Sequence, residues 1–359
     1  MTEIYITEDC IQAMSNIEDD SVDMVFADPP YNLQLNKSLH RPDHSDVSGV
    51  DHEWDKFRSF EEYDKFTINW LTEVKRILKP NGTIWVIGSY HNIYRVGSIL
   101  QNLGYWVLND IIWNKSNPMP NFKGNRFTNA HETIIWASQN KKSKYTFNYQ
   151  AMKVMNEDKQ MRSDWFLPIC SGNERIKESG KTLHPTQKPE ALLFRIILSS
   201  TNMGDTILDP FFGTGSTGAV AKKLKRNFIG IERDSNYMKF AKQRIKNVTS
   251  FSTDELQTVK NNKNNIKIPF CTLIDNGLLK IGTKLHDINK KYNAIVRADG
   301  SIKTNNSLEG SIHKVGAQIQ GNSGCNGWQF WHYEKEGKLI SIDALRKKIR
   351  DQLDSISSK

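Results

Sequence analysis

The sequence contains few cysteines and no long hydrophobic run. Its cysteines number only four and form no C-x-x-C pair, so they indicate neither a disulfide framework nor a zinc site. The start, MTEIYITED, carries acidic residues where a secretory signal needs basic ones, and no apolar run approaches the roughly 18 residues of a membrane span. We therefore expect a soluble, cytoplasmic protein with no membrane partner and no bound metal.

Acidic residues are outnumbered by basic ones. The chain has 49 Lys and Arg against 40 Asp and Glu, a net charge of +9 and a pI near 9.1. Such a balance favours a polyanionic partner such as nucleic acid, although basic surfaces also serve solubility. With 359 residues, of which 38% are hydrophobic, the chain can bury the core of one large domain plus a smaller one, or of two comparable domains.

Short apolar runs alternate with helical patterns from the start to about residue 247. After Ser59 the apolar residues recur at a spacing near 3.6, Ser59 and Glu62 are typical of a capping box, and KPNG at 79–82 predicts the end of that helix. Strand and helix in this rhythm predict an α/β fold, a doubly wound, mostly parallel sheet with helices on both faces. The predicted strands are residues 4–7, 22–27, 83–88, 111–113, 133–137, 206–208 and 227–231.

The composition changes near residue 250. A polar stretch without apolar periodicity predicts a linker at 251–270, between a catalytic domain at 1–250 and a small α+β domain at 271–359. In the last part, short strands at 294–296, 330–333 and 338–340 precede a helix at 342–353. Six of the nine net positive charges lie beyond residue 250. This suits a second contact with nucleic acid, and equally a solvated charged face.

Closely spaced glycines join a predicted strand to a predicted helix. The stretch TILDPFFGTGSTG, residues 206–218, contains G-x-G-x-x-G, whose glycines let the backbone pass close to a ligand. Glu232 ends the next strand, 19 residues after Gly213, where a carboxylate can accept hydrogen bonds from ribose hydroxyls. A dinucleotide and S-adenosylmethionine both satisfy this arrangement. The proline and aromatic residues before Gly213 favour S-adenosylmethionine, because an apolar-walled loop suits a pyrophosphate poorly.

A second motif, ADPPYNLQL at residues 27–35, follows the predicted strand 22–27. The Asp28 carboxylate and the Pro29 carbonyl could each accept an N–H of an exocyclic amine on a nucleobase and so turn its lone pair toward a methyl donor. Pro29 and Pro30 fix φ and remove competing backbone donors. Tyr31 offers a flat face on which an extruded base can stack. Four such letters alone would equally form a proline-rich surface turn.

The two motifs together resemble an amino-methyltransferase of the β order, in which the catalytic motif precedes the cofactor motif. More closely, the chain resembles the HinfI-type and cell-cycle-regulated DNA adenine-N6 methyltransferases along almost its whole length. The segments that carry this resemblance are ADPPYNLQL at 27–35, WNKSNPMPNF at 113–122, HPTQKP at 184–189 and DPFFGTGSTGAVA at 209–221. Residues 311–314 and 326–331 are similar to the restriction-adenine-methylase-associated (RAMA) domain of these enzymes, which the resemblance implies assists DNA binding.

The resemblance implies a role for each matching position in a methyltransferase fold that uses S-adenosylmethionine. Asp28, Pro29, Pro30 and Tyr31 form the implied catalytic corner. Asp9 is the weakest of the implied cofactor contacts, because an acidic residue before a helix is more often an N-cap. The implied cofactor-binding residues are Asp9, Asp28, Thr186, Lys188, Asp209, Phe211, Gly213, Thr214, Gly215 and Glu232.

DNA contacts are expected in two loop regions. The region of about 114–182 is expected to read the target sequence, and 32–57 is long enough to form a flap over a duplex. Each of these side chains could instead be a solvated loop residue. The candidates are Lys37, Arg41, Lys115, Asn117, Asn121, Lys123, Arg126 and Asn129. The resemblance further implies double-stranded DNA as substrate, the target GANTC, a homodimer and a possible restriction endonuclease partner.

Several other functions are compatible with parts of the sequence. An enzyme of the same class could methylate cytosine N4 or RNA, whereas cytosine-C5 transfer needs a Pro-Cys nucleophile that the chain lacks. A nicotinamide-dependent dehydrogenase would use the glycine loop but would leave the Asp-Pro-Pro-Tyr corner without a role. A DNA-binding protein with an inactive site is the third alternative.

Overall fold

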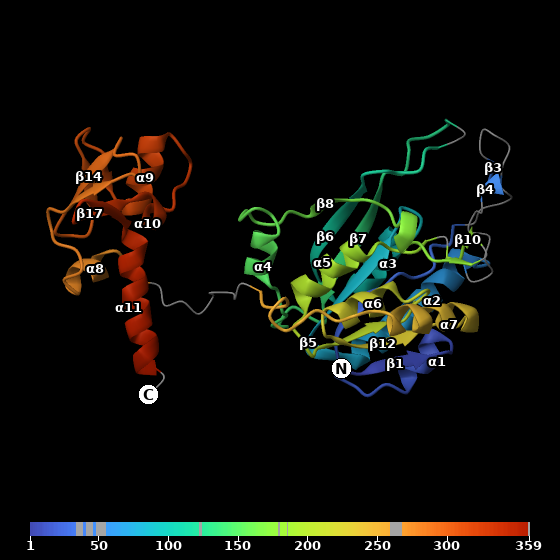
Figure 1. Ribbon diagram of the computed structural model, residues 1–359. Helices are drawn as coiled ribbons and strands as arrows, with labels where there is room; N and C mark the ends of the chain where they lie inside the picture. The colour runs from blue at the N-terminus through green and yellow to red at the C-terminus, as the bar shows by residue number, and fades with distance from the viewer. Residues whose placement is uncertain are drawn as a thin grey trace. The chain divides into compact units, whose positions relative to one another are not determined.

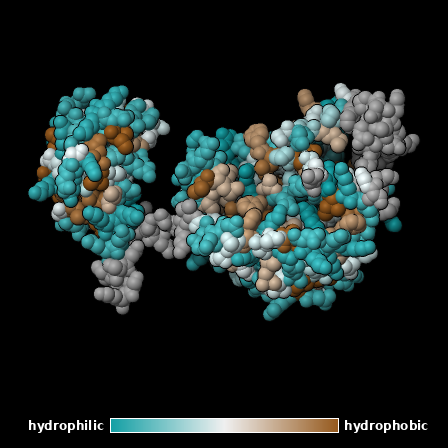
Figure 2. Space-filling view, in the orientation of Figure 1, coloured by the Kyte–Doolittle hydropathy of each residue, from teal (hydrophilic) through white to brown (hydrophobic). Residues whose placement is uncertain are grey.

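The computed structural model describes residues 1–33, 39–40, 46–47, 55–121, 124–178, 180–184, 186–258 and 268–357. The chain divides into two compact units, Met1–Asn261 and Asn262–Lys359, and each is described by itself (Figure 1). Hydrophilic residues cover most of the visible face of both units (Figure 2). Within the described ranges, no helix combines the length and the apolar character needed to cross a membrane.

The first unit is built on an eight-stranded sheet in the order β1-β12-β11-β2-β5-β7-β6-β8. Neighbouring strands are parallel except where β7 pairs with β5 and β6. The predicted α/β class with a mostly parallel sheet is therefore confirmed. The strands are β1 (Glu3–Ile6), β2 (Val22–Ala27), β5 (Leu78–Gly88), β6 (Trp106–Lys115), β7 (His131–Ser138), β8 (Asp164–Leu167), β11 (Thr206–Asp209) and β12 (Asn227–Ile231).

Helices cover both faces of this sheet (Figure 1). Successive side chains of a strand point to opposite faces, and β2 follows this rule from Met24 on: Val25 and Ala27 pack in one core, Met24 and Phe26 in the other. The first core is closed by α1 (Cys10–Ser15), α2 (Phe60–Ile77) and α3 (Ile93–Asn102). The second is closed by α5 (Glu190–Ser200), α6 (Ser216–Lys223) and α7 (Ser235–Lys246).

Helix α2 begins at the predicted cap. Ser59 accepts a hydrogen bond from the Glu62 amide, while the Glu62 carboxylate accepts one from Arg58 N rather than from Ser59 N. The helix ends at Ile77, as the KPNG stretch predicts. Residues 79–82 nevertheless continue as strand β5, and the register of β5 against β2 shifts there. A Cβ at Gly82 would lie 2.8 Å from the Leu78 side chain and 3.0 Å from the Lys79 carbonyl oxygen, so this irregular segment has little room for a larger residue.

The remaining elements of the first unit are short. They are β3 (Leu39–His40) paired with β4 (Asp46–Val47), β9 (Lys177–Glu178) paired with β10 (Lys181–Thr182), α4 (Tyr149–Val154), and a 3₁₀ turn at Gly172–Glu174. Strand β8 is not among the strands predicted from the sequence. It pairs with β6 and fixes part of the expected target-reading region to the sheet.

The second unit is a six-stranded antiparallel sheet in the order β16-β15-β14-β13-β17-β18. Its strands are β13 (Lys284–His286), β14 (Asn293–Val296), β15 (Ile302–Thr304), β16 (Glu309–Gly310), β17 (His332–Lys335) and β18 (Lys338–Ser341). Its helices are α8 (Cys271–Asp275), α9 (Ile312–Gln320), α10 (Gly327–Phe330) and α11 (Ile342–Ser357). This is a small α+β arrangement.

One expectation for this part of the chain needs correction. The strand predicted at 330–333 begins only at His332, because Phe330 is the last residue of helix α10. Between them, the Trp331 indole is fully buried and donates a hydrogen bond to the Ile312 carbonyl at 3.0 Å. The boundary between the two units falls inside the range 251–270 predicted as a linker. Leu256 is buried in the core of the first unit, and Ile268 and Phe270 are buried in that of the second.

Candidate active site

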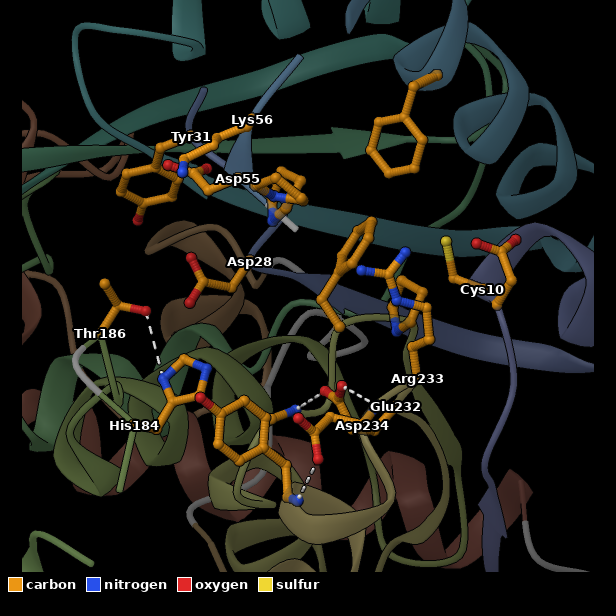
Figure 3. Close-up of a pocket in the computed structure, with 18 of the residues that line it drawn as sticks. Cys10, Asp28, Tyr31, Asp55, Lys56, His184, Thr186, Glu232, Arg233 and Asp234 are labelled. Carbon is orange, nitrogen blue, oxygen red and sulfur yellow. Dashed lines mark hydrogen bonds between the residues drawn. The ribbon is translucent and has the colours of Figure 1, made fainter. Parts of the chain in front are cut away.

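A cavity of about 430 Å³ opens at the carboxyl ends of four adjacent parallel strands, β1, β12, β11 and β2. This is the edge at which sheets of this kind bind ligands. The corner at Asp28 and the turn at Gly213, 185 positions apart in the sequence, both contribute to its wall. Figure 3 shows Asp28 and Tyr31 on one side of the pocket and Cys10 on the other. The lining residues also include Glu8, Asp9, Pro29, Pro30, Leu33, Asp55, Lys56, Phe57, Glu62, Phe66, His184, Thr186, Pro210, Phe211, Glu232, Arg233, Asp234 and Tyr237.

The Asp-Pro-Pro-Tyr corner is held by its backbone. The Pro30 carbonyl accepts a hydrogen bond from the Tyr63 hydroxyl at 2.9 Å. Asn32 has φ of +52°, and the amides of Asn32 and Leu33 both donate to the Asp55 carboxylate, at 2.8 and 3.0 Å. These bonds fix the chain on both sides of Tyr31, and the paired strand β2 ends at Ala27, directly before Asp28. The side chains of Asp28 and Tyr31 therefore start from a rigid base.

The two oxygens of Asp28 differ in their surroundings. Oδ2 accepts a hydrogen bond from Lys188 Nζ at 2.6 Å, and Lys188 is itself buried. Oδ1 is buried and has no hydrogen-bond partner among the described residues. An unpaired buried carboxylate oxygen costs about 1–3 kcal/mol or more, so one oxygen of Asp28 is open to a donor that the described residues do not supply.

Asp28 belongs to a network of four largely buried charged side chains, together with Lys188, Glu132 and Lys115. The Glu132 carboxylate, on β7, accepts a hydrogen bond from the Tyr31 hydroxyl at 3.0 Å and forms an ion pair with Lys115 at 2.8 Å. Lys188 lies 4.0 Å from the same carboxylate and 5.3 Å from the centre of the Tyr31 ring. Glu132 is not among the residues predicted from the sequence, because nothing in the motif at 27–35 reveals which strand lies near it.

Burial and partner charges set the pKa values in this network. Burial raises the pKa of Asp28, and Lys188 opposes that effect only in part. Burial also acts to raise the pKa of Glu132, but Lys188 and Lys115 lower it by more than burial raises it. The net pKa of Glu132 is therefore lowered, which favours the ionised carboxylate. For Lys188, burial acts against the charged form, whereas Asp28 and Glu132 raise its pKa above the ordinary range. Two carboxylates and two lysines thus balance one another.

The glycine loop places its three glycines in different roles. Gly213 lines the cavity with φ of +52°, and its amide donates to Glu232 at 2.8 Å. Gly215 has φ of +76° and caps α6, where a Cβ would lie 2.8 Å from the Ala241 Cβ. A Cβ at Gly218 would lie 2.6 Å from the Phe212 ring. Gly215 and the buried Thr214, both predicted to bind cofactor, are not among the cavity-lining residues and instead form the packing behind the loop.

The other predicted cofactor residues fall into two groups. Asp9, Phe211, Thr186 and Glu232 line the cavity, and Asp9 is at the same time the N-cap of α1, accepting from the amide of Ile11 at 3.0 Å. Lys188 and Asp209 are buried behind the wall. Asp209 accepts from the Phe211 amide at 2.9 Å, and burial raises its pKa to about 7.

The cavity wall is acidic although the whole chain is basic. Among the lining residues that the structure describes, the cations are Lys56 and Arg233. The carboxylates are Glu8, Asp9, Asp28, Asp55, Glu62, Glu232 and Asp234. Such a wall favours a cationic ligand and disfavours a pyrophosphate.

The predicted DNA contacts are distributed differently from the expectation. Lys115 was expected to contact DNA, and this expectation needs correction. Its side chain is largely buried, and its ammonium group pairs with Glu132 rather than facing solvent. Asn117 is exposed and accepts from the Ile169 amide at 3.0 Å. Exposed Arg126 donates to the Tyr90 hydroxyl, after β5, and Asn129 is also exposed. Asn121 donates to the Arg126 carbonyl at 3.0 Å. Lys37, Arg41 and Lys123 lie outside the described residues.

Comparison with protein families gives two matches, one for each part of the chain. The family model described as DNA methylase matches residues 22–243. The one described as Restriction Enzyme Adenine Methylase Associated, or RAMA, matches residues 251–355.

Among characterised proteins, the chain is 49% identical over 345 residues to the type II methyltransferase M.HinfI of Haemophilus influenzae, covering 96% of each chain. It is 47% identical over 243 residues to the type II methyltransferase M2.DpnII of Streptococcus pneumoniae, covering 67% of this chain and 89% of that protein.

Solved structures with the same architecture include the M1.HpyAVI–SAM complex. It has a TM-score of 0.50 and 30% identity, covering 68% of this chain and 99% of that one. The cytosine-N4-specific PvuII DNA methyltransferase has a TM-score of 0.53 at 19% identity, covering 71% of this chain and 90% of that one, and supports the fold alone.

Proposed function

The chain belongs to the DNA methylase family and carries a RAMA domain, and on that premise we propose that it transfers a methyl group from S-adenosylmethionine to the N6 amino group of adenine in duplex DNA. It is an enzyme of the type II DNA methyltransferase group, to which its relatives M.HinfI and M2.DpnII also belong. The finer parts of the proposal are the target GANTC, extrusion of the adenine from the helix, a homodimer, and a cognate restriction endonuclease that shares the site.

The proposal depends most on one observation: Asp28, whose Oδ1 has no partner among the described residues, lines the cavity. Asp28 Oδ1 is buried and without a partner among the described residues, on the same wall that Gly213 and Glu232 form. The exocyclic amine of adenine brings two N–H donors. We expect one of them to be donated to Asp28 Oδ1 and the other to the Pro29 carbonyl, which would leave the nitrogen lone pair facing the methyl donor.

The residues of the cavity fit S-adenosylmethionine. This cofactor carries a positive sulfonium and supplies an activated methyl group. The acidic wall suits its charge, and it also argues against the dehydrogenase alternative, because a dinucleotide would bring two phosphates against seven carboxylates. Glu232 would hold the ribose hydroxyls while it keeps the Gly213 amide, and Phe211 and Phe66 would provide the apolar surface for the adenine.

Tyr31 would hold the extruded base. Its ring lines the cavity next to Asp28, and the hydroxyl is anchored on Glu132. Stacking on an aromatic ring is worth about 1–3 kcal/mol per base, which offsets part of the few kcal/mol that unstacking from the duplex costs. No covalent intermediate is needed, since placement and charge complementarity suffice for transfer from an activated donor.

Recognition of the duplex is assigned to the loop that carries Asn117, Asn121, Arg126 and Asn129 and to the basic second unit. Asn and Arg side chains pair with adenine and guanine edges in the major groove. Lys37, Arg41 and Lys123 remain proposed contacts from the sequence. The net charge beyond residue 250 supports a role of the RAMA domain in binding the phosphate backbone.

The test is methyl transfer from labelled S-adenosylmethionine into duplex DNA, single-stranded RNA and duplexes without GANTC, followed by nucleoside analysis. We expect N6-methyladenine in GANTC duplexes and none with Asp28→Ala. Transfer to RNA, or a product of N4-methylcytosine, would replace adenine N6 by one of the two alternatives in the same class. Unchanged methylation by Asp28→Ala would leave only a binding role for this cavity.

A further inference from the structure

The structure assigns to Glu132 a positioning role: we propose that its carboxylate takes the hydrogen bond of the Tyr31 hydroxyl and thereby keeps Asp28 Oδ1 open for the substrate amine. This inference rests on the proposed function, because it concerns the group that Asp28 accepts from. It adds a residue from β7, on the far side of β5 from the strand that carries the Asp-Pro-Pro-Tyr corner.

The Tyr31 hydroxyl has two carboxylates within its reach. Its hydrogen bond goes to Glu132 Oε2 at 3.0 Å. Asp28 lies on the same side of the pocket (Figure 3), and Lys188 is close to both residues, 2.6 Å from Asp28 Oδ2 and 5.3 Å from the centre of the Tyr31 ring. The hydroxyl also acts to lower the pKa of Asp28, which burial raises, although Oδ1 accepts no hydrogen bond from it. A hydroxyl has one proton to donate. As long as that proton lies on Glu132, it does not occupy Asp28.

Glu132 is kept able to accept this proton by two lysines. Lys115 pairs with Oε1 at 2.8 Å, and Lys188 lies 4.0 Å from Oε2. The side chain of Glu132 is only 12% exposed, so water has little access to compete for the Tyr31 hydroxyl. The two oxygens of Glu132 thus have separate tasks, one on Lys115 and the other on Tyr31.

The consequence of losing Glu132 follows from the cost of an unpaired buried donor. A buried hydroxyl without an acceptor costs about 1–3 kcal/mol, and the Asp28 carboxylate also interacts with this hydroxyl. Without Glu132, the Tyr31 hydroxyl would therefore turn to Asp28. The adenine amine would then have to displace an internal hydrogen bond before it could bind.

A double-mutant cycle separates this effect from a structural one. Glu132→Met keeps the length of the side chain but removes the acceptor, and Tyr31→Phe keeps the ring but removes the proton. The matched control is Lys115→Met, which breaks the same ion pair and leaves the acceptor in place. Glu132→Met also removes a negative charge near Asp28. That electrostatic effect on Asp28 is the same in the parent and in Tyr31→Phe, so it cancels in the cycle.

The first readout is independent of methyl transfer. In protein labelled with carbon-13 at the aspartate side chains, the Asp28 resonance is assigned with Asp28→Asn. We expect Glu132→Met to shift this resonance in the chain that has Tyr31 and to shift it much less in Tyr31→Phe. An equal shift in both backgrounds would overturn the proposal. So would a shift caused by Lys115→Met that needs the Tyr31 hydroxyl as much as the shift caused by Glu132→Met does.

The second readout is kcat at saturating S-adenosylmethionine and DNA. We expect Glu132→Met to lower kcat about tenfold more in the parent than in Tyr31→Phe, a coupling of ordinary size for contacting residues. Equal losses in both backgrounds would contradict the proposed role. If the parent protein transferred no methyl group to DNA, the proposed function would fail, and the Asp28 resonance would still decide where the Tyr31 proton lies.

Discussion

Replacing Asp209 by asparagine should make the protein more stable at alkaline pH and leave it nearly unchanged in acid. Asp209 is 4% exposed, and burial, with Asp28 and Glu232 nearby, raises its pKa to about 7. A carboxyl group whose pKa is higher in the folded state contributes stability that is fully present below its unfolded pKa of 3.8 and is lost as pH rises through about 7. The asparagine side chain of the variant cannot ionise and keeps an oxygen for the Phe211 amide.

The size of the effect follows from the same pKa. The interval from 3.8 to about 7, at 1.36 kcal/mol per pH unit, corresponds to an upper limit of about 4 kcal/mol at pH 8. Denaturant unfolding of Asp209→Asn and of the parent at pH 5 and pH 8 measures it, with the exposed Asp254→Asn as control. A stability difference that is the same at both pH values would refute the assignment of a buried, proton-binding Asp209.

The remaining predictions concern the cavity and its frame. Asp28→Asn should lower methyl transfer at least about 100-fold while isothermal titration shows S-adenosylmethionine binding within a few-fold of the parent. Because the ionised carboxylate is the acceptor and its pKa is raised by burial, kcat of the parent should fall as pH drops through that raised pKa in a pH–rate profile. Glu232→Ala should weaken cofactor binding about tenfold, measured by the same titration. Gly230→Ala would place a Cβ 2.6 Å from the Phe212 ring and should cost about 1–3 kcal/mol, read as a lower Tm.

The frame of the site could be predicted from the sequence because it depends on local patterns. Strands β2, β11 and β12 were each marked by an apolar run, and the motifs followed directly after those runs. Since carboxyl ends of parallel strands meet at one edge, the corner at Asp28 and the turn at Gly213 had to approach each other if the sheet was parallel. The helix α2 was equally local, set by its cap and its 3.6-residue period.

The charge network could not be predicted, because it depends on which strands become neighbours. Lys115 stood in a stretch that reads as loop, but β6 extends to Lys115 and β7 begins at His131, so the two strand ends bring Lys115 and Glu132 together. In the same way, the glycine spacing does not distinguish a glycine that faces a ligand from Gly215. Gly215 packs against Ala241, where a Cβ would lie 2.8 Å from the Ala241 Cβ.

The charge distribution explains how one chain can serve two ligands of opposite charge. The net charge of +9 attracts a polyanion at long range, where the sum over the whole molecule acts. Inside the cavity the nearest charges act most strongly, because the Coulomb energy falls with distance, and there carboxylates predominate. Under the proposed function, an extruded adenine would bring no charge of its own, so it could enter this acidic pocket while its phosphates stayed outside. The buried pairs of Asp28 with Lys188 and of Glu132 with Lys115 add no net charge. They can therefore orient an uncharged amine without repelling the cationic cofactor beside it.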